Sequence, residues 1–63
     1  MPYVNVRVAG ALTATQKKQI VARITQVMEE VAGKPPAATY VVIDEVPRHN
    51  WAKSGMLLEE PPD

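Results

Sequence analysis

The sequence predicts an α+β fold: a single β-α-β unit with two parallel strands, one long helix and a short C-terminal hairpin. Apolar and polar residues alternate at the start of the chain, which is the two-residue period of a strand. Apolar residues then recur at helical spacing from 14 to 32, and a second apolar run follows at 39–45. A strand, a helix and a strand in succession indicate parallel strands joined by a right-handed crossover.

The first strand starts at Pro2, because proline cannot donate to a sheet ladder and is tolerated at the first residue of a strand. After Pro2, the side chains alternate between two faces. One face carries Val4, Val6 and Val8, and the other carries Tyr3, Asn5 and Arg7. The strand therefore has one strongly apolar side.

The helix is predicted from Ala14 to about Ala32. Thr13 and Gln16 have the spacing of a capping box, in which each side chain pairs with the other residue's backbone N–H. Gly33 suits the end of the helix, and the prolines that follow prevent its continuation. Its predicted packing stripe consists of Ile20, Ile24, Val27, Met28 and Val31, with Arg23 on the solvated side.

The second strand is predicted at residues 39–45 and ends before Pro47. Its centre, Val41-Val42-Ile43, is apolar on both faces, as in a strand covered from two sides. Residues 48–58 are rich in turn formers, and we expect a loop or small hairpin that reaches a neighbouring subunit. The chain is thus a single domain over 1–58, followed by a tail at 59–63 that we predict to be disordered.

The chain is too small to be self-sufficient. A domain near 63 residues buries only about 60% of its unfolded surface. It has no cysteine for a disulfide, and one histidine, His49, argues against a zinc site. Two strands alone are marginally stable, while 46% of the residues are hydrophobic. These features predict an obligate oligomer.

Charge and hydropathy exclude several classes of partner. Seven basic and seven acidic side chains cancel, and no basic stripe is present, which argues against nucleic acid. No apolar run approaches membrane-spanning length, and no secretory signal is found, so we expect a cytoplasmic protein without a membrane partner.

Pro2 is also a candidate catalytic residue. Removal of Met1 would expose its nitrogen as a secondary amine on a rigid strand, whereas with Met1 attached it is an amide without basicity. A free α-amino group titrates at roughly 7.7–8.0, and burial beside apolar groups lowers that pKa. A base near the working pH suits proton transfer. The simpler interpretation is that Pro2 only starts the strand.

The chain resembles the 4-oxalocrotonate tautomerase family over roughly residues 1–58. The resemblance lies in the order of Met1-Pro2 before a strand, one helix, a strand ending Val-Ile-Asp-Glu-Val, and the Pro-Arg-His-Asn-Trp run before a glycine. It implies a homohexamer built as a trimer of dimers, no cofactor and a small-molecule substrate. It further implies an amino-terminal proline, here Pro2, that moves a proton on an enol or α-keto acid as general base and then general acid.

The resemblance transfers the substrate-binding positions unevenly. The aromatic residue of the family's hydrophobic wall falls on Trp51. The arginine that holds a distal carboxylate falls on Leu12, and the arginine supplied by a neighbouring subunit falls on Tyr40. Leucine cannot replace a charge-assisted contact, whereas tyrosine can donate one hydrogen bond to a developing enolate oxygen. Arg48 and Lys53, on either side of Trp51, are candidates for a replacement anion anchor. We therefore expect a substrate with one carboxylate or none.

Two other functions remain open on this sequence. Relatives of this fold perform hydratase-type or dehalogenase-type reactions on unsaturated acids with a protonated proline. Alternatively, the chain is a non-catalytic subunit, or one chain of a hetero-oligomer whose partner supplies the arginines. Trp51 and Tyr40 would then be ordinary interface residues, a role in which both residue types are enriched.

Overall fold

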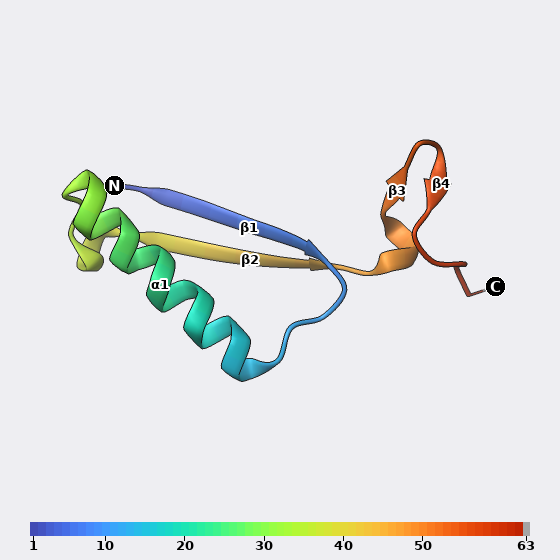
Figure 1. Cartoon of the computed structure of the whole chain (residues 1–63), viewed down its shortest axis with the longest axis horizontal. Coiled ribbons are helices and arrows are strands. Elements are labelled where there is room, and N and C mark those ends of the chain that lie inside the picture. The colour runs from blue at the N-terminus through green and yellow to red at the C-terminus, as the bar shows by residue number, and fades with distance from the viewer. Residues whose placement is uncertain (63) are drawn as a thin grey trace.

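The computed structural model describes residues 1–62. Strand β1 (Tyr3–Ala9) is followed by helix α1 (Ala14–Ala32) and strand β2 (Tyr40–Val46), which pairs in parallel with β1 (Figure 1). Two 3-10 turns, η1 (Pro36–Ala38) and η2 (Arg48–Asn50), flank β2, and strands β3 (Ala52–Lys53) and β4 (Met56–Leu57) form an antiparallel hairpin. The predicted β-α-β unit with a C-terminal hairpin is confirmed.

Helix α1 has the predicted caps at both ends. The Gln16 N–H donates to Thr13 Oγ1 at 3.1 Å, and the Thr13 N–H donates to Gln16 Oε1 at 2.9 Å, which completes the capping box. At the other end Gly33 has a φ of 66°, and its N–H donates to the Glu29 carbonyl at 3.1 Å. The bond from the Gly33 N–H to the carbonyl four residues earlier is that of an αL cap, and the Lys34 N–H also donates to Met28 O at 3.1 Å.

The second strand begins one residue later than predicted and also ends one residue later. Thr39 still belongs to the preceding turn, because its N–H donates to Pro36 O at 3.2 Å and its hydroxyl donates to Pro35 O at 2.9 Å. Beyond the hairpin, residues 59–62 contain no helix or strand. The last residue of the predicted tail, Asp63, lies outside the described residues.

The two faces of the sheet have different surroundings. The helix side carries Val4, Val6 and Val8 opposite Val41, Ile43 and Glu45. The other side, called the helix-free face below, carries Tyr3, Asn5 and Arg7 opposite Tyr40, Val42 and Asp44. Within the described chain α1 covers only the first, and Tyr3 (62% exposed), Tyr40 (56%) and Val42 (41%) remain open on the second.

The predicted helical stripe divides in two. Ile24 and Met28 of this stripe, with Val21 beside them, are half-buried on the side of α1 that faces the sheet, and Ile20 is also half-buried. Val27 is 54% exposed and Val31 is 82% exposed. At 100° per residue, Val27 lies roughly 90° around the helix from the centre of the sheet-facing group. A single helix on two strands cannot cover so wide an apolar surface.

A single chain has no closed core. None of the described residues 1–62 is fully buried, and the accessible surface is 4916 Å². A compact monomer of this mass exposes about 4,000 Å². The radius of gyration is 15.0 Å, against about 11 Å for a compact domain of this length. This uncovered surface is what an oligomeric subunit would present when separated from its neighbours.

The hairpin is a short arm that extends from the end of β2, away from α1 (Figure 1). Ser54 and Gly55 have φ values of 55° and 80°, as a two-residue type I′ turn requires. Met56 is 74% exposed and Leu57 is 46% exposed. The arm therefore presents apolar side chains that its own chain leaves uncovered. Among the described helices, none is long and apolar enough to cross a membrane.

Candidate active site

The predicted site residues fall into two groups at opposite ends of the sheet. Pro2 and Tyr40 lie where β1 and β2 begin. The other four lie beyond the ends of β1 and β2 (Figure 1): Leu12 in the β1–α1 loop, Arg48 in η2, Trp51 directly after η2, and Lys53 in the arm. Seven residues of strand at roughly 3.3 Å each separate the two ends by about 23 Å. One chain alone does not bring the two groups together.

At the first end, Pro2 and Tyr40 are held together through their backbones. The Tyr40 N–H donates to the Pro2 carbonyl at 2.9 Å, and Tyr3 stands opposite Tyr40 in the register. Pro2 is half-buried. Because side chains alternate along a strand, Pro2 shares the helix side with Val4, whereas Tyr40 lies on the helix-free face. The ring of Pro2 and the phenol of Tyr40 in one chain thus belong to opposite faces of the sheet.

At the other end, the β1–α1 loop is tied to the end of β2. The Gly10 N–H donates to Val46 O at 2.7 Å. Gly10 has a φ of 93°, and a Cβ at this position would stand 3.9 Å from Arg48 Cγ, so the loop and η2 are neighbours. The Leu12 N–H donates to Glu45 Oε2 at 2.8 Å. Leu12 and Arg48 are thereby placed on the same end of the molecule.

Glu45 also pairs with a lysine of α1. Lys17 Nζ lies 2.6 Å from Glu45 Oε1. This ion pair and the N–H of Leu12 lower the pKa of the Glu45 carboxyl from its ordinary value. A single carboxylate therefore joins the end of β2 to both the loop and the first turns of the helix.

Trp51 sits at the base of the arm. Its N–H donates to Arg48 O at 3.2 Å, and its carbonyl accepts the Leu58 N–H at 2.8 Å. The tryptophan is half-buried, while Arg48 and Lys53 are exposed. In the sequence this apolar ring has a cation on either side, a combination that suits a small organic anion with an apolar body.

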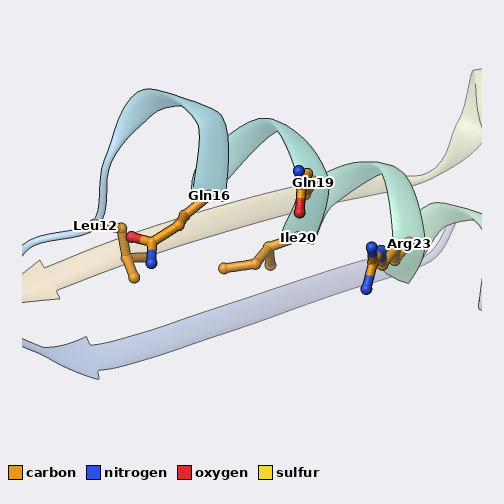
Figure 2. A pocket seen from close by; sticks show the side chains of 5 residues that line it. All are labelled: Leu12, Gln16, Gln19, Ile20 and Arg23. Atoms are coloured by element: carbon orange, nitrogen blue, oxygen red, sulfur yellow. The ribbon is translucent and has the colours of Figure 1, made fainter.

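A groove of about 270 Å³ runs along α1. Figure 2 shows its lining on the side of α1 toward β1, and the residues are Leu12, Gln16, Gln19, Ile20 and Arg23. The sequence predicts a site position for Leu12, only a capping role for Gln16 and a solvated position for Arg23. Gln16, Ile20 and Arg23 recur at intervals of three and four residues, which is the signal that would have grouped them.

The helix-free face carries a polar network. Asn5 Nδ2 donates to Asp44 Oδ2 at 2.8 Å, and Arg7 Nη2 lies 3.3 Å from the same oxygen. These hydrogen bonds, first from Asn5 and then from Arg7, lower the pKa of the Asp44 carboxyl. The network lies beside Val42, on the face that α1 leaves open.

Comparison with known proteins agrees with this architecture. The family model described as tautomerase enzyme matches residues 2–60. A probable tautomerase K2 of Dickeya dadantii (strain 3937) is 46% identical over 61 residues, covering 95% of this chain and 91% of that protein. The 2-hydroxymuconate tautomerase of Pseudomonas putida is 33% identical over 60 residues, 95% of each chain. The crystal structure of YwhB, a homologue of 4-oxalocrotonate tautomerase, superimposes with a TM-score of 0.88 at 28% identity, covering 97% of this chain and all of that one.

The fold and these matches define a small tautomerase-type isomerase, and the chain belongs to the tautomerase family. The family resemblance expected from the sequence is confirmed. The names of these relatives place the enzyme among the isomerases.

Proposed function

We propose that this protein is a cofactor-independent tautomerase in which Pro2, freed of Met1, moves a proton on a small enol or α-keto acid. The observation that carries the proposal is the position of Pro2. The family match begins at this residue, which is half-buried at the start of β1. As general base the amine nitrogen accepts the enol proton, and as general acid it returns a proton to carbon.

A second copy of the chain completes this site. Within residues 1–62 the outer edge of β1 has no strand partner, and unpaired strand edges favour pairing with another chain. Antiparallel pairing of two β1 strands about a two-fold axis would bring the beginning of one strand beside the end of the other. Pro2 of one copy would then lie near Leu12 and the arm base of its partner, and the groove on α1 would face the partner's helix.

A third copy is needed for Tyr40. In its own chain the Tyr40 side chain lies on the helix-free face, away from the Pro2 ring. Stacking of helix-free faces from separate dimers would cover Tyr3, Tyr40 and Val42, and the family resemblance assigns a neighbouring subunit's Tyr40 position to the site of Pro2. A homohexamer arranged as a trimer of dimers satisfies both requirements.

The lining of this site favours a substrate with one carboxylate or none. The 2-hydroxymuconate in the name of the Pseudomonas putida relative carries two carboxylates, whereas Leu12 and Tyr40 provide no positive charge. Trp51 and Leu12 would form the apolar wall, and Tyr40 would donate a hydrogen bond to the enolate oxygen. Arg48 and Lys53, on either side of Trp51 in the sequence, are the cations that we propose to hold a single carboxylate.

The proposal is tested first at Pro2. Intact mass of the natively expressed protein is expected to show loss of Met1. Titration of the Pro2 nitrogen by NMR should give a pKa below roughly 7.7, the lower end of the ordinary range for an α-amino group. Pro2→Ala should reduce kcat for an enol acid such as the enol form of phenylpyruvate by about 100-fold or more, with the oligomer intact in sedimentation.

Four outcomes would contradict this proposal. Retained Met1 or unchanged turnover in Pro2→Ala would remove Pro2 from the mechanism. Hydration or dehalogenation of an unsaturated acid in place of tautomerisation would identify the hydratase or dehalogenase class. Failure of the chain to self-associate would identify it as a subunit that needs a different partner.

The substrate assignment is tested at Leu12. Leu12→Arg would restore a charge-assisted contact and should raise kcat/KM for 2-hydroxymuconate by about tenfold, mainly through KM. The matched control is Leu12→Met, which keeps an apolar side chain of similar volume. No gain from arginine would mean that this position does not line the site.

A further inference from the structure

The loop that carries Leu12 is short, and its backbone is held at defined points. It runs from the end of β1 to the start of α1 at residues 10–13. The N–H of Gly10 is bound by the carbonyl of Val46, and the N–H of Thr13 is bound by the side chain of Gln16. Between these two points, the N–H of Leu12 is bound by the Glu45 carboxylate at 2.8 Å. Glu45 is therefore the side chain that ties the backbone of Leu12 to the sheet.

The position of Glu45 suits this task. It stands on the helix side of β2, opposite Val8, and its side chain is 29% exposed. A hydrogen bond with an ionised acceptor is shorter and stronger than one between neutral groups. Lys17 Nζ, at 2.6 Å from the second carboxylate oxygen, compensates the negative charge. The loop thus gains a strong anchor, and the lysine offsets the charge that would otherwise repel an anionic substrate.

We infer that Glu45 is a positioning residue: it fixes the β1–α1 loop so that Leu12 closes the apolar wall of a neighbouring copy's proline site. This inference rests on the proposed function. Glu45 acts through Leu12 and touches no reacting atom. Displacement of a wall residue by even 1 Å weakens substrate binding, so the effect of losing Glu45 should depend on the presence of Leu12.

The decisive experiment is a double-mutant cycle with the enol form of phenylpyruvate as the probe. Glu45→Ala should lower kcat/KM about tenfold, mainly through KM, because the wall contributes to binding of substrate and transition state alike. In the Leu12→Ala background the same change should cost less than about twofold. Glu45→Gln, whose amide oxygen can still accept the Leu12 N–H, should recover most of the loss.

The matched control is Glu30→Ala. Glu30 also accepts a side-chain hydrogen bond, from Gln26 Nε2 at 2.9 Å, but it lies near the far end of α1. This variant should leave kcat/KM within about twofold of the parent. Equal losses from Glu45→Ala with and without Leu12 would overturn the positioning role, because a general loss of structure does not depend on one side chain.

A second readout separates this inference from the proposed function. The Leu12 amide resonance in a ¹⁵N spectrum should shift as the Glu45 carboxyl is protonated, and the shift should vanish in Glu45→Gln. If the chemical shift of the Leu12 amide does not change on acidification, the inference is overturned even if Pro2 catalyses the reaction. If Pro2→Ala leaves turnover unchanged, the proposed function fails, and the positioning role of Glu45 fails with that function. A Leu12 amide that still titrates would in that case show that Glu45 holds the loop only for structural reasons.

Discussion

The two faces of the sheet are formed by the same two strands but have opposite surroundings. On the helix side, Val4, Val6 and Ile43 lie under α1, and Glu45 links the sheet to the loop and the helix. On the helix-free face, Tyr3, Tyr40 and Val42 are 62%, 56% and 41% exposed. The first face is organised by its own chain. The second carries these three large side chains beside the polar network of Asn5, Arg7 and Asp44, and the described chain does not cover it.

This difference between the two faces links assembly of the subunits to completion of the candidate site. Burying apolar surface stabilises by roughly 25 cal/mol per Å², so an open apolar face favours association. The candidate site residues are divided between the two ends of that same sheet. Assembly would therefore stabilise the fold and complete the site in one step.

The largest expected effect comes from a charge on the helix-free face. Val42→Asp would place a carboxylate where we propose that subunits pack, and an unpaired buried charge costs several kcal/mol. We expect the assembly to dissociate at micromolar concentration in sedimentation velocity, with loss of activity. Ala22→Asp, which adds the same charge on the exposed side of α1, is the control and should leave the assembly intact.

If Val42→Asp remains fully assembled and active, the helix-free face is not the subunit interface. The comparison between the two faces would then reduce to a difference in exposure. The requirement for a neighbour's Tyr40 would lose its structural basis.

A smaller effect is expected on the helix side. Met28→Ala removes a half-buried side chain between α1 and the sheet and should lower the free energy of unfolding by about 1.5 kcal/mol. Urea unfolding at one fixed protein concentration measures this, since assembly contributes to apparent stability. Glu29→Ala, on the exposed side of the same helix, should stay within about 0.5 kcal/mol of the parent. Equal effects of the two variants would show that the helix-side contacts contribute little.

Most of the fold was predictable because its signals are local. The alternation after Pro2, the Thr13–Gln16 box and Gly33 each depend on residues a few positions apart, and all three appear in the structure. Val27 and Val31 were assigned to the packing stripe because periodicity gives the width of an apolar face. It does not give how much of that face one chain can cover.

The site was predictable only in part. Pro2 and Leu12 could be placed at opposite ends of a strand from their positions alone. The link between Leu12 and Glu45 spans 33 residues, and no spacing rule connects a loop amide to a carboxylate on the second strand. The groove residues Gln19 and Arg23 were missed for a similar reason. The tertiary arrangement decides which polar side of α1 lies next to the edge of a strand, and local sequence does not reveal this.

The smallest expected effect is that of acid, and it also distinguishes the faces. Asp44 and Glu45 are adjacent on β2, and both have a pKa lowered in the folded chain by their hydrogen-bonded partners. Each therefore contributes stability that is present above the ordinary carboxyl pKa of roughly 4 and is lost as the pH falls through the lower folded value.

In the dissociated Val42→Asp protein, Glu45→Gln should flatten the dependence of the urea midpoint on pH between 7 and 3. In the assembled protein, protonation of Asp44 would leave Arg7 without its partner inside an interface, so the subunit dissociation constant should rise as the pH falls. Asp44→Asn removes the titrating carboxyl and should flatten this dependence over the same range. If Asp44→Asn alters only the urea midpoint and leaves the dissociation constant unchanged across this range, the Asn5–Asp44–Arg7 network faces water in the assembly as it does in the single chain.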